Sequence, residues 1–285
     1  MKVTLLEAPI CKGSPTDGSQ YAYRALMAAG LPSAFADVRC LPMEEPTVTV
    51  SADFPNMKDL DAVMAVSRGL SSHVAGAIRE GRLPMVIGGD HSVAMGSIDG
   101  ASSVVGSDRL AVIYIDGHTD INTEKTTETG FIHGMPLAAA MGLCDDRLTV
   151  KNKINLLGKN TYIIGARSID AGEYPIIEEQ GVTLYTADDV REKGMEAVIT
   201  EVLNRITAPA VHLSFDVDVL DETIFPATGY RMPKGLALCD VETALSACFA
   251  TGKVISFDVV EYNPTLDTDG QYADQLISLL TRTIL

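Results

Sequence analysis

The chain lacks the features that mark disulfide-linked, thiolate-zinc and membrane proteins. Its 285 residues include five cysteines, an odd number without C-x-x-C spacing, so neither a disulfide framework nor a cysteine zinc site is indicated. No apolar run reaches the ~18 residues of a membrane helix. The apolar stretch in the opening MKVTLLEAPI is too short for a signal peptide. We therefore expect a soluble cytoplasmic protein with reduced thiols.

Basic residues are also scarce. Lysine and arginine number 22 against 38 aspartates and glutamates, which leaves a formal net charge of −16 at pH 7. Such a balance argues against nucleic acid and anionic membranes as partners. A general acidic surface accounts for it, and it is compatible with a small cationic ligand.

The chain has no internal repeat, low-complexity tract or break in composition, so we expect one domain over residues 1–285. The segment 42–55, rich in Pro, Glu and Thr, is interpreted as a surface excursion. Short apolar runs typical of buried strands alternate with helical patterns, which predicts an α/β fold with a mostly parallel central sheet of about eight strands covered on both faces. The predicted strands are 2–6, 34–38, 84–88, 110–116, 161–165, 182–185, 210–216 and 254–260. The predicted helices are 20–29, 58–80, 92–104, 135–141, 171–179, 187–206, 238–250 and 271–282.

Three of these strands run into segments rich in aspartate and histidine. The segments are Gly88-Gly89-Asp90-His91-Ser92, Asp116-Gly117-His118-Thr119-Asp120 and Asp216-Val217-Asp218. Parallel strands bring their carboxyl ends to one edge of a sheet, where ligands bind in α/β folds. We expect four aspartates and two histidines to meet there.

This combination favours a pair of divalent cations. Alternate residues of an extended chain lie on one side, which would align Asp116, His118 and Asp120, and likewise Asp216 and Asp218. Clustered carboxylates without cations would repel and take up protons. Oxygen and imidazole ligands without thiolate suit manganese or a similar first-row ion, and two ions can lower the pKa of a water held between them. Each segment alone also has an ordinary structural explanation, as a turn, a solvated loop or a buried histidine.

The same segments resemble a known family. GGDHS, DGHTD and SFDVDVLD, in this order, look like the ureohydrolases, which comprise arginase, agmatinase and their relatives. The resemblance begins at APICKGSPTDGSQYAYRALMAAGL, ends at DVVEYNPTLD and is closest to arginase. It implies a three-layer α/β/α fold, two Mn²⁺ per subunit (Co²⁺, Ni²⁺ or Fe²⁺ being alternatives) and a homo-oligomer, trimer or hexamer.

The resemblance also implies ligands. One metal would be held by His91, Asp116, Asp120 and Asp216, and the second by His118, Asp116, Asp216 and Asp218. Gly117 stands where the family usually has alanine.

For the substrate, DINTEKTTETGFIHG resembles the arginase branch. The resemblance places Asn122, Thr127 and Thr129 at the amino-acid end of arginine. It places Asp170 and Glu173 at the α-amino group, His133 as a mobile catalytic histidine, and Glu261 at the guanidinium. Asp170 could cap a helix, a role that is compatible with binding, while His133 could be an ordinary loop histidine and Glu261 could form a structural ion pair.

The implied reaction is hydrolysis of L-arginine to L-ornithine and urea by a metal-bridging hydroxide, with Asp120 and His133 handling protons. Phe131 and Tyr230 replace the asparagine and threonine that are usual in arginases, and Glu222 replaces a proline. These departures keep open another guanidino or formimino hydrolase, acting on agmatine, guanidinobutyrate or formiminoglutamate, and a weakly active arginine- or metal-binding relative. Asp258, inside the last predicted strand, could orient a ligand histidine or make a structural hydrogen bond.

Overall fold

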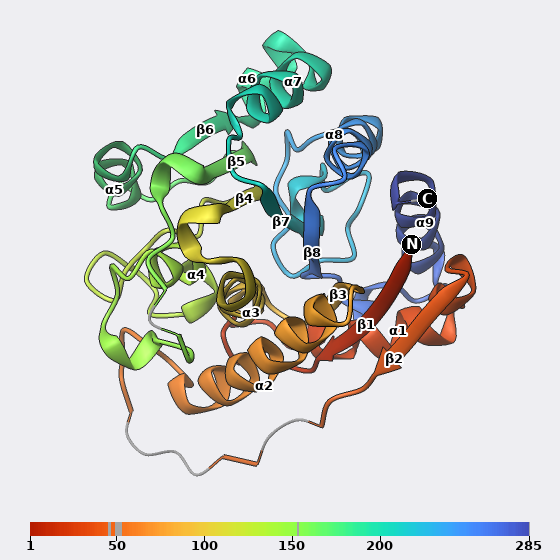
Figure 1. Ribbon diagram of the computed structural model, residues 1–285, viewed down its shortest axis with the longest axis horizontal. Helices are drawn as coiled ribbons and strands as arrows, with labels where there is room; N and C mark the ends of the chain where they lie inside the picture. Colours follow the sequence, from red (N-terminus) through yellow and green to blue (C-terminus); the bar gives the residue numbers. More distant parts are fainter. Residues whose placement is uncertain (45–46, 49–52, 153, 285) are drawn as a thin grey trace.

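One eight-stranded sheet, with every neighbouring pair parallel, forms the centre of the computed structural model (Figure 1). The structure describes residues 1–44, 47–48, 53–152 and 154–284. The strands are β1 (Lys2–Ala8), β2 (Asp37–Leu41), β3 (Leu83–Gly88), β4 (Leu110–Ile115), β5 (Thr161–Ala166), β6 (Thr183–Thr186), β7 (Ala210–Asp216) and β8 (Val254–Val260). Their order across the sheet is β2-β1-β3-β8-β7-β4-β5-β6.

Helices cover both faces of this sheet in three layers (Figure 1). On one face lie α2 (Leu60–Arg79), α3 (Ala94–Val105), α4 (Pro136–Ala140) and α5 (Glu173–Gln180). On the other lie α1 (Ala22–Ala28), α6 (Ala187–Lys193), α7 (Met195–Arg205), α8 (Leu238–Ala250) and α9 (Gln271–Ile284). Each face has its own hydrophobic cluster, so the fold prediction is confirmed.

The strand sequences explain this arrangement. Every residue of β3, β4, β5 and β7 is buried, as their continuous apolar runs predict for strands covered on both sides. Along β4 the side chains alternate, so that Ile113 joins one cluster and Tyr114 the other. The edge strand β2 is partly exposed along its whole length.

The bounds of two predicted elements are wrong. Strand 34–38 begins and ends three residues too early, because Leu31–Ala34 forms a 3₁₀ helix and β2 runs from Asp37 to Leu41. The predicted helix 187–206 is two helices, because Gly194 adopts φ 82° between α6 and α7, a backbone region that ends an α-helix. Part of the excursion 42–55 lies outside the described residues.

The central strands position the site. Strands β3, β8, β7, β4 and β5 are consecutive neighbours, and the segments that follow them leave the same edge of the sheet. Among the helices of the described residues, none is both long enough and apolar enough to cross a bilayer.

Candidate metal centre and substrate cavity

The segments after β3, β4 and β7 share one local structure. In each, the first aspartate turns its carboxylate back onto the backbone N–H two residues later. The accepted hydrogen bonds are Ser92 N to Asp90 Oδ1 at 3.0 Å, His118 N to Asp116 Oδ1 at 2.7 Å, and Asp218 N to Asp216 Oδ1 at 2.7 Å. Such turns are a common conformation for aspartate, and they bend the chain sharply at the end of each strand.

This bending corrects the expectation that alternate residues of an extended chain would align the ligands. Asp120 has φ 48°, in the left-handed region, and Val217–Val219 forms a 3₁₀ helix. The predicted residues still meet, because tight turns direct their side chains to one place. Left-handed backbone at a residue other than glycine is strained and often marks a functional site.

Two groups of potential ligand atoms form where the segments meet. His91, Asp116 and Asp216 make up the first group, and Asp116, His118 and Asp218 the second, with the atoms of each group lying within 4.8 Å of one another. Asp116 belongs to both groups. The structure therefore contains two candidate metal-binding groups that share a carboxylate.

Distances around the two histidines define these groups. Nδ1 of His91 lies 2.9 Å from Asp116 Oδ2, 3.1 Å from Asp216 Oδ2 and 3.3 Å from Asp120 Oδ2. Nδ1 of His118 lies 3.0 Å from Asp218 Oδ2 and 3.5 Å from Asp116 Oδ1. All six residues predicted as metal ligands are thus gathered in one place.

The donor set fits divalent cations. Buried His91 Nδ1 and Asp116 Oδ2 have no hydrogen-bond partner within the described part of the protein. The other ring nitrogen of His91, Nε2, lies 2.8 Å from the hydroxyl of Ser214, which leaves Nδ1 available as a ligand. The ring of Tyr114 stacks on His91 at 4.3 Å between centroids, and its hydroxyl donates to Asp120 Oδ2 at 2.9 Å.

The cluster's electrostatics point the same way. Burial, together with the charge of Asp116, raises the pKa of Asp120 to about 8. Burial and the charge of Asp218 raise the pKa of Asp216 well above its ordinary value. Buried carboxylates with raised pKa values, such as Asp120 and Asp216, keep their protons unless a positive charge takes the place of the proton. Divalent cations can supply that charge.

Glu261 follows β8 and lies behind His91. It is also in the left-handed region, with φ 62°, and its Oε1 accepts from His91 N at 3.0 Å. Its Oε2 is buried without a hydrogen-bond partner among the described residues, and His133 Nδ1 lies 3.5 Å from Oε1.

The backbone N–H of Glu261 donates to the carbonyl of Gly89. A Cβ at Gly89 would overlap the carbonyl oxygen of Ile10, at 1.4 Å. Gly89 is therefore required by close packing and not only by a turn.

A cavity of about 270 Å³ opens beside these groups. His118, Asp120 and His133 border it at the metal-group end. Its other walls include every remaining residue predicted for substrate binding except Glu261, namely Asn122, Thr127, Thr129, Asp170 and Glu173. Phe131, Gly134, Ser168, Tyr230 and Met232 complete the wall of the cavity.

Hydrogen bonds determine which acidic groups in this cavity remain available. Both oxygens of buried Glu173 accept backbone N–H groups, from Ile121 at 3.0 Å and from Asp170 at 2.8 Å. Asp170 Oδ2 accepts from the Asn122 amide at 2.8 Å. Asp170 makes no side-chain cap on α5, so the capping alternative is wrong. Glu173 therefore ties two loops together, while Asp170 presents its charge to the cavity.

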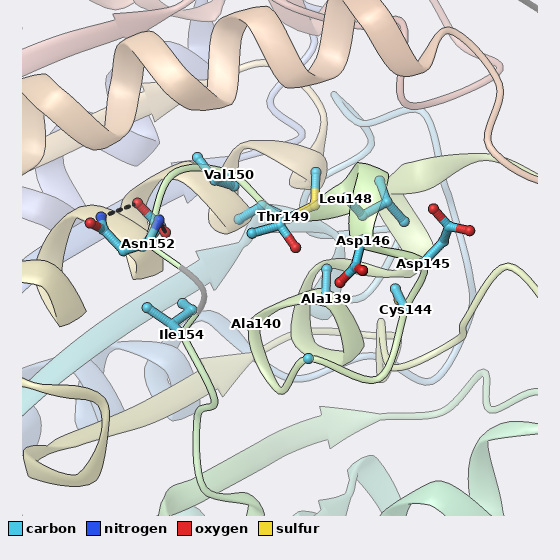
Figure 2. A pocket seen from close by; sticks show the side chains of 13 residues that line it. Ala139, Ala140, Cys144, Asp145, Asp146, Leu148, Thr149, Val150, Asn152 and Ile154 are labelled. Atoms are coloured by element: carbon cyan, nitrogen blue, oxygen red, sulfur yellow. Dashed lines mark hydrogen bonds between the residues drawn. The ribbon is translucent and has the colours of Figure 1, made fainter.

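A second, smaller cavity lies beside the segment from Gly142 to Ile154 (Figure 2). Its volume is about 30 Å³, which is room for about one water molecule. Asp99 in its wall is already bonded to Ser71 and to Asn152, at 2.6 and 2.8 Å. This smaller cavity is therefore not a candidate substrate site.

Comparison with known proteins agrees with this geometry. The family model described as Arginase family matches residues 1–285. The arginase of Bacillus subtilis (strain 168) is 37% identical over 241 residues, covering 80% of this chain and 79% of that protein. The solved arginase of Entamoeba histolytica in complex with L-ornithine superposes with a TM-score of 0.91 at 30% identity, covering 99% of this chain and 97% of that one. The Bacillus cereus arginase structure gives 0.92 at 29%, with 100% and 98% covered.

The chain belongs to the arginase family. It is accordingly a ureohydrolase, and the predicted resemblance is confirmed.

The substitution of glycine for the alanine usual in the family has a local explanation. A Cβ on Gly117 would lie 2.6 Å from Arg167 Nη1 and 2.9 Å from Asp218 Oδ1. The Arg167 guanidinium fills that space and donates to the carbonyls of Asp218, Val219, Leu220 and Met232. Arg167 thus restrains the loop that holds Asp218. Its guanidinium occupies the space that an alanine methyl group would take at position 117 of this ureohydrolase.

Sequence reasoning missed Tyr114, Ser214 and Arg167. Tyr114 and Ser214 each precede an aspartate by two residues on a buried strand, so strand alternation could have identified them. No comparable local signal marks Arg167. Asp258 contacts His212 Nε2 at 3.1 Å and accepts from Ser97 at 2.5 Å, so it makes structural contacts and does not orient a ligand histidine of this arginase-family site.

Proposed function

We propose that this protein hydrolyses the guanidinium group of L-arginine to give L-ornithine and urea. The single observation that supports this proposal best is the cavity that extends from Asp170 to His118 and Asp120, beside the two candidate metal groups. A guanidinium at one end and an α-ammonium at the other would match the acidic groups at its two ends. The E. histolytica relative was solved with L-ornithine, the product that this reaction would release.

We infer that the two groups hold manganese, through His91, Asp116, Asp120 and Asp216 on one side and His118, Asp116, Asp216 and Asp218 on the other. Carboxylate oxygen and imidazole nitrogen suit this ion, although cobalt, nickel and iron accept similar donors. When bound, a pair of such cations supplies the positive charge that lowers the pKa of water towards neutrality.

Glu261 is the residue we assign to the guanidinium. Its Oε2 has no partner among the described residues, and the carboxylate is 2% exposed, so a planar cation with paired N–H donors would satisfy it. Binding the guanidinium there would bring its carbon next to the candidate metal groups.

Proton transfer would use Asp120 and His133. Asp120 borders the cavity, and the Tyr114 hydroxyl on Oδ2 leaves Oδ1 to accept a proton from the attacking water. Burial opposes the charge of His133, but its hydrogen bond to Glu261 and the charge of that group raise its pKa. A histidine with a raised pKa at the cavity wall is suited to protonate the leaving amine.

An assay of urea and formamide release over four guanidino or formimino compounds tests the proposal. Protein preloaded with Mn²⁺ and freed of excess metal would be given L-arginine, agmatine, guanidinobutyrate or formiminoglutamate at equal concentrations. We expect urea from L-arginine at the highest kcat/KM. Faster hydrolysis of agmatine would show that Asp170 does not select an amino acid, and release of formamide from formiminoglutamate alone would reassign the substrate.

The variant Asp170→Asn provides a matched test, since it removes one charge and keeps the shape of the side chain. We expect kcat/KM for L-arginine to fall by about tenfold or more, as for a lost charge-assisted hydrogen bond. Slow turnover of guanidinobutyrate, which has no α-amino group, should be unchanged. An equal loss for both compounds would contradict the role of Asp170.

A further inference from the structure

Tyr230 makes an unusual set of contacts at the metal-group end of the cavity. Its hydroxyl lies 3.4 Å from His133 Nε2, and the two ring centroids are 5.1 Å apart at an interplanar angle of 39°. The edge of the same ring meets His118, with 5.5 Å between centroids. One side chain therefore contacts both the expected proton donor and a candidate metal ligand.

The backbone around Tyr230 is anchored on both sides. Thr228 forms an antiparallel bridge with Tyr262, the residue after Glu261. Gly229 packs so closely on Thr16 that a Cβ would lie 2.4 Å from its hydroxyl oxygen. Beyond Tyr230, the carbonyl of Met232 accepts from Arg167 Nη2 at 3.3 Å. These contacts keep the phenol in place instead of leaving it on a free loop.

His133 is held at three points. Its backbone N–H donates to Gly13 at 3.0 Å, its Nδ1 lies 3.5 Å from Glu261 Oε1, and its Nε2 faces the Tyr230 hydroxyl. A phenol hydroxyl can accept from Nε2 of the charged imidazole and donate to Nε2 of the neutral one, so this contact holds the ring in both protonation states and keeps Nδ1 facing Glu261.

We propose that Tyr230 is a positioning residue for catalysis in this chain, acting through its hydroxyl on His133. It fixes which ring nitrogen of His133 faces Glu261 and keeps the imidazole beside the site where the leaving amine forms. This inference rests on the proposed function, because it concerns the proton transfer of that reaction.

The test is a double-mutant cycle with Tyr230→Phe and His133→Asn in the manganese-loaded protein. Tyr230→Phe removes only the hydroxyl, so we expect kcat for L-arginine to fall by about tenfold while KM changes by less than about twofold. In the His133→Asn background, the same substitution should change kcat by less than about twofold. Tyr21→Phe, at an exposed tyrosine away from the cavity, is the matched control and should equal the parent protein.

Binding of L-ornithine, measured by calorimetry, gives a readout that does not depend on turnover. We expect equal affinity in the parent protein and in Tyr230→Phe, because the hydroxyl acts on His133 and not on the ligand. Unchanged kcat in Tyr230→Phe, equal losses in both backgrounds, or a loss confined to ornithine affinity would each overturn the inference. Failure of the proposed function would appear separately, as absence of urea formation by the parent protein.

Discussion

At the residue scale, the site depends on the groups that fix its ligands as well as on the ligands themselves. His91 can offer Nδ1 to a metal because its other ring nitrogen, Nε2, pairs with the Ser214 hydroxyl at 2.8 Å. The chain contains a similar pair elsewhere, since Ser256 lies 2.8 Å from Nδ1 of His212. All four residues are almost fully buried, but of the two histidines only His91 belongs to a candidate metal group.

This pair of serines gives a matched prediction. Ser214→Ala should weaken metal binding about 10- to 100-fold, which is usual when the hydrogen-bond partner of a ligand histidine is removed. Ser256→Ala should lower stability without changing metal affinity. Competition with a chelator of known affinity, followed by metal analysis, measures both. Equal metal affinity in the two variants would contradict the assignment of His91.

At the scale of elements, local backbone conformation explains why one predicted helix is two helices. Helical periodicity continues from residue 187 to 206, but Gly194 at φ 82° and ψ 142° separates α6 from α7. The same periodicity in α2 runs through Gly76 without a break. Composition alone does not distinguish these two glycines, because the difference lies in the backbone angles that each adopts.

We predict opposite effects for alanine at these two positions. Neither Cβ would meet another atom within 4 Å, so the substitutions differ in backbone conformation and not in packing. Gly194→Ala should destabilise by about 1–3 kcal/mol, because its backbone region is almost restricted to glycine. Gly76→Ala should stabilise by about 0.5–1 kcal/mol, because alanine loses less entropy in a helix. Urea unfolding measures both, and a loss of stability in Gly76→Ala would argue against this explanation.

At the scale of the whole molecule, folding concentrates negative charge at one edge of the sheet. The chain has a formal net charge of −16 at pH 7. Four of the aspartates that contribute to this charge are buried together in the site. Burial opposes the charge of His91, but the negative charges of Asp116 and Asp216 beside its Nδ1 outweigh burial and raise its pKa well above its ordinary value. Together with the raised pKa values of Asp120 and Asp216, this means that the folded metal-free protein holds more protons than the unfolded chain.

Metal removal should therefore make stability depend on pH. Groups whose folded-state pKa is raised stabilise the protein at low pH, and this contribution is lost as pH rises through the folded-state pKa. With a chelator present, we expect the melting temperature to fall between about pH 5 and pH 8, because the unfolded aspartate and histidine side chains release protons there that the folded cluster retains. Asp116 has a lowered pKa and acts in the opposite direction only at more acidic pH.

With manganese bound, we expect a higher melting temperature that depends less on pH, because the cations replace the protons. Thermal unfolding with chelator and with Mn²⁺, in the same buffers, separates the site from the acidic surface that both samples share. A chelated protein whose melting temperature does not fall over this range would show that the clustered carboxylates are not the groups responsible.

The sequence by itself determined the chemistry of the site and the class of fold. Apolar runs ending in GGDHS, DGHTD and DVD predicted both the strands and the six ligand-type residues, because strand burial and donor identity are local properties. Only the tertiary structure decided how these pieces meet. Strand order places β8 between β3 and β7, so that Glu261 contacts His91 across 170 residues, and Tyr230 reaches His133 across 97. Such contacts depend on how distant elements pack against one another, which residue spacing along the chain does not specify.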